Sequence, residues 1–343
     1  MAGLTSKATA AAVIRLSHVF GADRLLVQAG GGNISAKTAP DRMAIKASGC
    51  LLREVDAHRG WTWVNPEEIC QGLRRISSTF TSTQKEMAYA GLLGKSSENP
   101  GLRPSMEAGF HAILPDRYIA HAHSLAGILL GLLPRKRALS LLREAGPKAW
   151  NMEWISPHLP GYALSHLLLA RSRSLHSRST PTLRILQNHG IIWTGPVESG
   201  IVKASRRFEK FFRAYFSLER YPFPHSEGSR GCRSRSQRSS DLCFCAWPSF
   251  RWDLRPLFPD FVIYFDLWSG NAPDVSRTGD RTVRVLASDA RNLRDKTEVF
   301  FAHAAVHTVA SRFGRYPALP ESMVGALKQM ETERLRILQA RAS

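Results

Sequence analysis

The chain has 343 residues, an apolar content of 43% and a formal net charge of +19. This length suffices for a substantial hydrophobic core in one or two domains. A membrane span is not expected, because the longest apolar run, around residues 125–133, is about half the length that a bilayer requires. The first residues contain no long apolar segment, so no signal peptide is expected either.

The five cysteines are an odd number at irregular spacing and do not predict a disulfide framework. Cys243 and Cys245 form a C-x-C rather than a C-x-x-C motif, and the other cysteines make no second pair. This usage is typical of a reducing compartment, and we therefore expect a cytoplasmic protein.

The high positive charge has two explanations. A basic surface would attract phosphorylated substrates or nucleic acid. Alternatively, the charge lies in segments outside the catalytic unit, and the Ser/Arg runs at 171–178 and 230–238 favour this second explanation. Since no aromatic residues interleave these runs to stack on bases, nucleic acid is not an expected partner, and neither is a membrane.

Apolar periodicity predicts both helices and strands in the first two thirds of the chain. Residues 8–20 and 198–215 have apolar side chains at helical spacing. A third helix is expected over 107–114, with Ser105 as its N-cap and Pro115 as its stop signal. The expected strands are 43–46, 62–64, 118–123, and the pair 183–187 and 191–193.

The composition changes near residue 219. Residues 226–252 are rich in Ser, Arg, Cys and Trp without a clear period, which is typical of a disordered linker or of a translated reading-frame slip. The elements expected beyond this stretch are strands at 257–265 and 282–287 and helices at about 297–312 and 320–341. The predicted domains are a catalytic domain over 1–218, a basic linker or aberrant segment over 219–256, and a C-terminal strand–helix extension over 257–343.

The most informative feature is a pair of histidines, His121 and His123, separated by one residue. Alternate residues of a strand point to the same face, so both imidazoles can bind one ion. A third imidazole, His189, follows in the run Asn188-His189-Gly190, and Glu107 offers a carboxylate. Such a set suits zinc with one exchangeable position. For the pair alone, core histidines bonded to the backbone are the simpler interpretation.

A family resemblance supports the metal interpretation. The five motifs that carry it are Gln28-Ala29-Gly30-Gly31-Gly32-Asn33-Ile34-Ser35, Ile45-Lys46-Ala47-Ser48-Gly49, Arg103-Pro104-Ser105-Met106-Glu107, His121-Ala122-His123-Ser124 and Asn188-His189-Gly190. In their order and spacing, residues 8–218 resemble the class II aldolase/adducin family, which includes the fuculose- and rhamnulose-phosphate aldolases. The resemblance implies an α/β/α sandwich with a central, mainly antiparallel sheet, one zinc ion per chain, and usually a homotetramer that acts on small sugars or sugar phosphates.

The resemblance also implies residue roles. His121, His123 and His189 would bind the zinc ion. Glu107 would be the base that moves a proton in retro-aldol cleavage, while the metal stabilises the enediolate. The residues expected around the substrate or its phosphate are Gly30, Gly31, Gly32, Asn33, Ser48, Gly49 and Ser105. We therefore expect a zinc-dependent aldehyde-lyase that cleaves a ketose or ketose phosphate.

Two departures from the family pattern concern the phosphate. Gly30 and Met106 stand where phosphate aldolases often carry hydroxyl residues, so two donors are missing, and Lys46 is a candidate replacement. The alternative reactions on the same metal site are epimerisation, dehydration and decarboxylation. Outside the enzymes, an adducin-like binding protein is the alternative, although such members lose the metal ligands that this chain keeps. The irregular stretch 226–252 also raises the alternative of a degenerate, poorly folded product.

Overall fold

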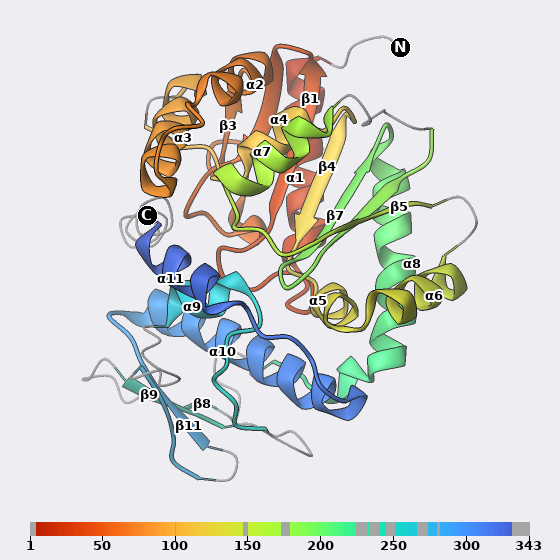
Figure 1. The fold of residues 1–343 in the computed structure, drawn as a ribbon, viewed down its shortest axis with the longest axis vertical. Coiled ribbons are helices and arrows are strands. Elements are labelled where there is room, and N and C mark those ends of the chain that lie inside the picture. The colour runs from red at the N-terminus through yellow and green to blue at the C-terminus, as the bar shows by residue number, and fades with distance from the viewer. Residues whose placement is uncertain are drawn as a thin grey trace.

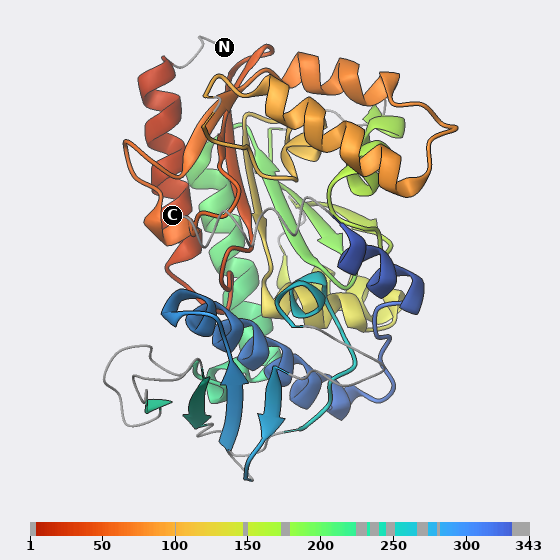
Figure 2. The same ribbon diagram turned by 90° about the vertical axis from the view of Figure 1, so that its left-hand side faces the viewer.

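A computed structural model describes residues 5–99, 101–146, 150–172, 179–223, 232–233, 240–244, 251–265, 274–279 and 282–330. A seven-stranded sheet with helices on both faces forms the centre, and a four-stranded sheet lies at one end (Figure 1). The long helix α10 (Ala290–Ala310) lies between the two sheets in both side views (Figures 1 and 2).

The central sheet is almost entirely antiparallel. Its strands follow the order β3-β2-β1-β4-β7-β6-β5, and only β5 and β6 pair in parallel. The strands are β1 (Asn33–Ala39), β2 (Arg42–Lys46), β3 (Trp61–Val64), β4 (Tyr118–Ala122), β5 (Asn151–Ile155), β6 (Thr182–Leu186) and β7 (Gly190–Gly195). This topology confirms the expected mainly antiparallel sheet in an α/β/α arrangement.

Alternation along the strands divides the core into two layers. On β7, Ile191 packs into one hydrophobic cluster and Ile192 into the other, because successive strand residues point to opposite faces. The helices on the first face are α1 (Ser6–Gly21), α5 (Leu125–Leu132), α6 (Arg135–Ala145) and α8 (Glu198–Phe216). Those on the second face are α2 (Pro66–Arg75), α3 (Ser82–Ser96), α4 (Ala108–Ile113) and α7 (Tyr162–Ala170). Figure 2 shows α1 on one side of the sheet and the orange helices α2 and α3 on the other.

Strand register brings distant motifs together at one end of the sheet. Asn33 at the start of β1 pairs with His121 on β4, and Ala122 pairs with Ile191 on β7. The turn between β6 and β7 therefore lies beside the end of β4. Asn188 in this turn has a φ of 59°, a conformation that asparagine tolerates better than most residues.

Most elements predicted in the catalytic region are confirmed. The helices predicted at 8–20 and 198–215 are α1 and α8, and the strands predicted at 43–46, 62–64, 118–123, 183–187 and 191–193 are β2, β3, β4, β6 and β7. Helix α4 starts at Ala108, one residue later than predicted, and Ser105 accepts a hydrogen bond from the Glu107 amide in the preceding turn. The sequence pattern did not predict β1, β5 and five of the described helices, namely α2, α3, α5, α6 and α7.

The strand predicted at 257–265 is wrong, because this stretch contains the helix α9 (Pro259–Tyr264). Phe261, Val262 and Tyr264 are all buried, so the apolar run has no polar face that would reveal a period. A short, continuous apolar run is compatible with a strand or a buried helix. Pro259 at the first helical turn is a start signal, since its missing N–H is not needed there.

The C-terminal region adds a second sheet and two further helices. The strands are β8 (Cys232–Arg233), β9 (Ser240–Phe244), β10 (Val275–Arg277) and β11 (Thr282–Leu286), and a short 3-10 turn is η4 (Ser311–Phe313). Two further 3-10 turns, η1 (Leu52–Glu54) and η3 (Leu218–Arg220), lie earlier in the chain. Strand β11 confirms the strand predicted at 282–287, and α10 begins earlier than the predicted 297. Helix α11 (Glu321–Gln329) matches the start of the last predicted helix, and residues 331–341 of that prediction lie outside the described residues.

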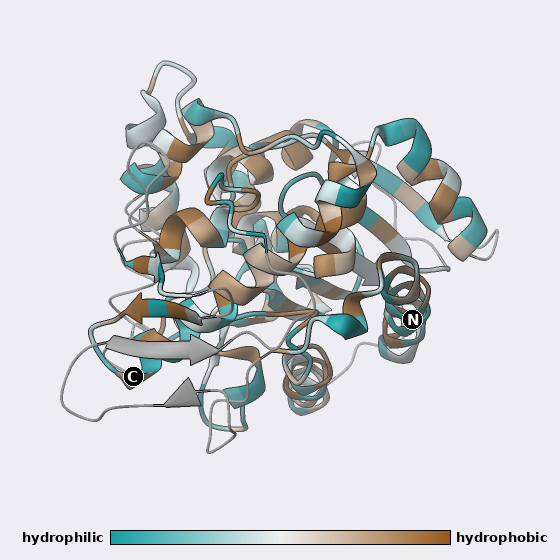
Figure 3. Cartoon of the chain, turned by 90° about the horizontal axis from the view of Figure 1, so that it is seen from below, coloured by the Kyte–Doolittle hydropathy of each residue, from teal (hydrophilic) through white to brown (hydrophobic). Residues whose placement is uncertain are grey.

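Much of the irregular stretch 226–252 also lies outside the described residues. Residues beyond it join the main core: Phe261 and Phe301 belong to the same hydrophobic cluster as Leu129 of α5. In Figure 3 the outer helices carry both hydrophilic and hydrophobic segments, as expected for helices with one face on this core. Among the described residues, the helices are too short or too polar to cross a bilayer.

The aromatic packing of α8 against the sheet gives a test of the core. Phe208 is fully buried between Trp193 and Phe212, with ring centroids 6.1 Å and 4.6 Å away. We expect Phe208→Ala to lower the free energy of unfolding by about 3–5 kcal/mol, because the cavity removes these contacts. Urea denaturation measures the loss. Phe80→Ala is the control, since Phe80 is 41% exposed and should lose much less; equal losses would contradict this packing.

Candidate metal centre

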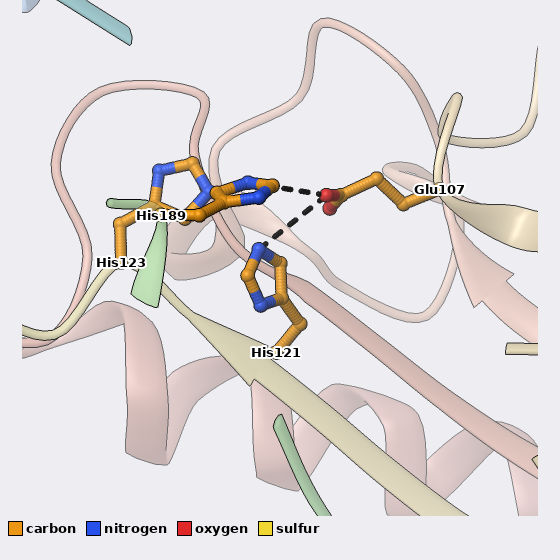
Figure 4. A group of neighbouring side chains, drawn as sticks. All are labelled: Glu107, His121, His123 and His189. Carbon is orange, nitrogen blue, oxygen red and sulfur yellow. Dashed lines mark ion pairs between the residues drawn. The ribbon is translucent and has the colours of Figure 1, made fainter. Parts of the chain in front are cut away.

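Four ionisable side chains meet at the end of the central sheet where β4 stops. His121 is on β4, His123 follows it, His189 is in the turn between β6 and β7, and Glu107 precedes α4. One ligand atom from each residue lies within 4.8 Å of the others. Figure 4 shows the three imidazoles and the carboxylate converging on one point. The structure thus brings together all four residues that the motifs indicated.

The carboxylate lies centrally between two of the imidazoles. Oε1 of Glu107 is 3.4 Å from Nε2 of His121 and 3.4 Å from Nε2 of His189, as the dashed lines in Figure 4 mark. The His121 ring centroid is 4.9 Å from that of His123 and 4.9 Å from that of His189. All four side chains are buried.

Hydrogen bonds outside the cluster orient these side chains. Nδ1 of His121 bonds to the carbonyl oxygen of Ile191 at 2.9 Å, so the ring presents Nε2 to Glu107. Nδ1 of His123 bonds to the carboxylate of Asp260, which also leaves Nε2 as the metal-binding atom. Outer hydrogen bonds of this kind fix the tautomer and the ring orientation of metal ligands.

Two residues of the sequence motifs hold Glu107 itself. Nδ2 of Asn33 donates to Oε2 of Glu107 at 2.9 Å. The same amide donates to Oγ of Ser105, and this oxygen accepts from the Glu107 backbone N–H at 3.2 Å. Asn33 and Ser105 were predicted to contact substrate, and the structure adds that both position the carboxylate.

The cluster fits a divalent metal ion. Oε1 of Glu107 and Nε2 of His121 are buried atoms with no hydrogen-bond partner among the described residues. Such atoms are rare in folded proteins and require an explanation such as a bound ion. Three imidazole nitrogens and one carboxylate oxygen form a donor set that suits zinc and related metals.

Burial gives the ligands the protonation states that metal binding requires. Burial lowers the pKa of His189 to about 3, assisted by the nearby His121, and burial likewise lowers the pKa of His121. Burial of Glu107 would raise its pKa, but the surrounding histidines and the bond from Asn33 outweigh this effect and lower it. At neutral pH the two imidazoles are therefore neutral and the carboxylate is ionised.

A pocket opens beside Glu107 and contains most of the predicted substrate residues. The predicted residues that line it are Gly30, Gly32, Asn33, Ser48, Ser105, Glu107, His123 and His189. Lys46 also lines this pocket, with Nζ 3.3 Å from the carbonyl oxygen of Gly30. Gly49 lies outside the lining, and its carbonyl accepts a hydrogen bond from Arg291 at 3.2 Å.

The glycine run allows the backbone to approach the histidines closely. A Cβ on Gly31 would lie 2.6 Å from Nδ1 of His123, which is closer than real atoms pack. Gly32 has a φ of 71°, in the left-handed region, and a Cβ there would lie 3.1 Å from the His121 carbonyl oxygen. The backbone N–H groups of Gly30 and Gly31 donate within the protein, to Tyr264 Oη at 3.2 Å and to the Gln28 carbonyl at 2.9 Å. The run therefore has a structural role beside the metal ligands.

Sequence reasoning missed the contribution of α9. Pro259, Asp260 and Ile263 line the pocket, and the hydroxyl of Tyr264 accepts the hydrogen bond from Gly30. The Phe258-Pro259-Asp260 start signal was the only available indication, and a helix starting there would place Asp260 and Tyr264 on one face.

The fold and the site define the class of protein. Residues 11–216 match the family described as the class II aldolase and adducin N-terminal domain. This match covers more than half of the chain, so the protein belongs to that family. Helix α9 and the other C-terminal elements lie outside the matched region.

Individual relatives are distant. The N-terminal class II aldolase domain of a conserved protein from Thermoplasma acidophilum shares the fold, with 22% identity and a TM-score of 0.50 over 63% of this chain and 97% of that one. An L-fuculose 1-phosphate aldolase matches at 17% identity and a TM-score of 0.41 over 65% of this chain and 91% of that one. In sequence, the chain is 22% identical over 187 residues to an uncharacterised oxidoreductase, YuxG, of Bacillus subtilis (strain 168). That match covers 52% of this chain and a quarter (25%) of the relative.

The contact between Gly31 and His123 can be tested directly. Gly31→Ala should lower the free energy of unfolding by about 1–3 kcal/mol, because the new methyl group overpacks the site. It should also weaken the binding of a divalent metal such as zinc to the cluster, since the ring of His123 must move. Denaturant unfolding of the metal-free protein and a zinc titration measure the two effects. Gly94→Ala is the matched control, because a Cβ there meets no atom within 4 Å. Wild-type behaviour of Gly31→Ala would contradict the contact.

Proposed function

We propose that the protein is a zinc-dependent aldehyde-lyase of the class II aldolase type, which cleaves a ketose or ketose phosphate by retro-aldol chemistry. The observation that carries this proposal is the Glu107 carboxylate, 3.4 Å from Nε2 of both His121 and His189 in a buried, metal-type cluster. Membership of the class II aldolase and adducin family supports the same reaction class.

His121, His123 and His189 would hold one zinc ion per chain. Zinc, when bound, supplies a Lewis acid that stabilises negative charge developing on the ketone oxygen of the substrate. Because all three imidazoles are buried, and those of His121 and His123 are oriented by hydrogen bonds, the ligand set would be preorganised before the ion arrives.

Glu107 is the residue that would move the proton. Retro-aldol cleavage takes a proton from a substrate hydroxyl, breaks the adjacent carbon–carbon bond and returns a proton to carbon on the ketone fragment. Glu107 is ionised at neutral pH and lines the pocket, so it can accept the first proton and donate it back. Asn33 holds one oxygen of the carboxylate and leaves the other directed at the histidines.

The polar end of the pocket would bind the hydroxyl groups or the phosphate of the substrate. Asn33, Ser48 and Ser105 offer side-chain groups along its wall, with Gly30 and Gly32 beside them. Lys46 supplies the positive charge, since its amino group is buried and lines the same pocket. We assign Gly31 and Gly49 to the support of this wall.

Epimerisation, dehydration and decarboxylation would use the same metal ligands, and a binding protein would use none of them. A carbonyl-release screen over ketoses and ketose phosphates separates these alternatives, because only retro-aldol cleavage releases an aldehyde and a ketone fragment. The proposal also includes a homotetramer, which sedimentation or light scattering would measure. Absence of carbonyl release with every substrate, from zinc-loaded protein, would contradict the lyase assignment.

Two substitutions separate proton transfer from metal binding. Glu107→Gln should reduce turnover by about 10²-fold or more while the protein retains zinc, because the amide cannot accept the proton. His123→Ala should lose most of the roughly one zinc per chain expected for the wild type. Turnover and metal analysis of the same preparations measure both effects. Near-normal turnover of Glu107→Gln, or wild-type zinc content of His123→Ala, would contradict these roles.

The role of Lys46 predicts a change in substrate preference. Lys46→Met should lower kcat/KM for a ketose phosphate more than for the free ketose, by about 10- to 100-fold, because hydrogen bonds to charged groups contribute about 1.5–3 kcal/mol. The ratio of the two kcat/KM values is the measurement, since a general loss of folded protein affects both equally. Lys37→Met is the control: Lys37 is a half-buried lysine of the same sheet, but it bonds to the carbonyls of Ala112 and Leu114. Equal effects of the two substitutions would place the phosphate elsewhere.

A further inference from the structure

The C-terminal segment, residues 251–330, contacts each of the three parts of the chain that form the site, which are the glycine loop (residues 28–32), the end of β4 and the turn before β7. The first contact joins Asp260 of α9 to Nδ1 of His123. In the glycine loop, Gly30 donates to Tyr264 at 3.2 Å, and the Ala29 amide donates to Glu298 of α10 at 2.8 Å. The turn before β7 is held in the same way, because Asn188 donates to the carbonyl oxygen of Leu257 at 2.9 Å. Figures 1 and 2 show α9 close to the end of the large sheet.

The contact of Asp260 differs from the others because it reaches a metal ligand. Asp260 is 1% exposed and His123 is 3% exposed, so their hydrogen bond forms away from bulk water. A buried carboxylate requires a compensating donor, and the imidazole N–H provides one. The bond also fixes the ring rotation and the tautomer of His123, so that Nε2 belongs to the ligand cluster.

The neighbouring backbone supports the same orientation. Gly31 lies against Nδ1 of His123, where even a methyl group would not fit. The ring is therefore restrained by Gly31 as well as by Asp260. By contrast, His121 is oriented by the carbonyl of Ile191 on the adjacent strand, within the region that matches the family. A carboxylate adds negative charge to its imidazole partner and makes the opposite nitrogen a better metal ligand.

We propose that Asp260 is a positioning residue for His123, so that the C-terminal segment completes the metal centre outside the family domain. The inference rests on the zinc site of the proposed function. Asp260 acts through His123, which it holds in the orientation and tautomer that bind the ion. Loss of an outer hydrogen-bond partner of this kind weakens metal binding by about 10- to 100-fold.

The competing explanation is that Asp260 only anchors α9. The chain provides a matched control in Asp253, a second carboxylate of the same segment that lies 3.4 Å from a histidine, His307. His307 is not part of the ligand cluster. A substitution at Asp253 therefore disturbs a carboxylate–histidine pair of the C-terminal segment without touching a ligand.

The experiment uses the full chain, stripped of metal by a chelator. Zinc is titrated against a chromogenic competitor for the wild type, Asp260→Ala, Asp260→Asn and Asp253→Asn, and the visible spectrum of bound Co²⁺ reports the ligand geometry. We expect Asp260→Ala to bind zinc about 10- to 100-fold more weakly and to show an altered Co²⁺ spectrum. Asp260→Asn should lose less affinity, because its amide oxygen still accepts a hydrogen bond while the charge is gone. Asp253→Asn should stay within about twofold of the wild type.

Thermal unfolding of the metal-free proteins shows whether each variant folds. If Asp260→Ala does not fold, the zinc affinity of Asp260→Asn, which keeps the side-chain shape, decides the outcome. The inference is overturned if the Asp260 variants that fold bind zinc within twofold of the wild type with an unchanged Co²⁺ spectrum. Equal losses in Asp253→Asn would also overturn it, because the effect would then be a general one of the C-terminal segment. A wild-type chain that binds no zinc would instead contradict the proposed function itself, so the two failures are distinguishable.

Discussion

The arrangement of polar groups around the site depends on one constraint, which is the burial of four ionisable side chains in one cluster. Three imidazoles and a carboxylate cannot leave water without compensation, because each unsatisfied polar group costs free energy in the core. The surrounding residues provide much of this compensation: Ile191 and Asp260 each bind one histidine, and Asn33 binds Glu107. Among the described residues, Oε1 of Glu107 and Nε2 of His121 are buried atoms without a hydrogen-bond partner, and they are directed toward each other in the cluster. The cluster and its polar surroundings therefore fit a divalent cation.

This constraint explains local features that would otherwise be unrelated. The glycine run approaches the histidines so closely that Gly31 cannot carry a side chain. Asn188 adopts a left-handed conformation in the turn that presents His189, and its side chain binds the backbone of the C-terminal segment. The glycine run therefore contacts a histidine of the cluster, and the turn that presents His189 contacts the C-terminal segment.

The cluster and the rest of the pocket would determine different properties of the proposed enzyme, namely its reaction class and its choice of substrate. The ligands and Glu107 suit any reaction that stabilises negative charge next to a ketone, so they define a reaction class. Under the proposed function, substrate choice would depend on the opposite wall, where Lys46 lines the pocket and the N–H of Gly30 is bonded to Tyr264. A phosphate in this pocket would meet a buried cation and side-chain donors, and it would compete with Tyr264 for the Gly30 amide. Under the proposed function, a preference for phosphorylated substrates would therefore depend on residues from both the family domain and α9.

The amino-acid sequence by itself indicated the four residues of the cluster. The H-x-H spacing places His121 and His123 on one face of a strand, and this geometry needs no tertiary information. The order and spacing of the motifs identified Glu107 and His189 as further candidates. Local apolar patterns predicted strands such as β4 and β7. The motif resemblance also indicated the mainly antiparallel sheet, which the strand order then confirmed.

Only the tertiary structure decided what surrounds these ligands. The bond between Asp260 and His123 joins residues 137 positions apart, and no local period encodes such a contact. Reliance on local periodicity also explains why residues 257–265 were predicted to be a strand. Phe261, Val262 and Tyr264 are all buried, so this helix shows no amphipathic pattern. The engagement of Gly30 by Tyr264 likewise exists only because α9 packs against the glycine loop. Local spacing selects the chemistry of the site, whereas long-range packing sets the orientation of its groups and which donors a substrate can reach.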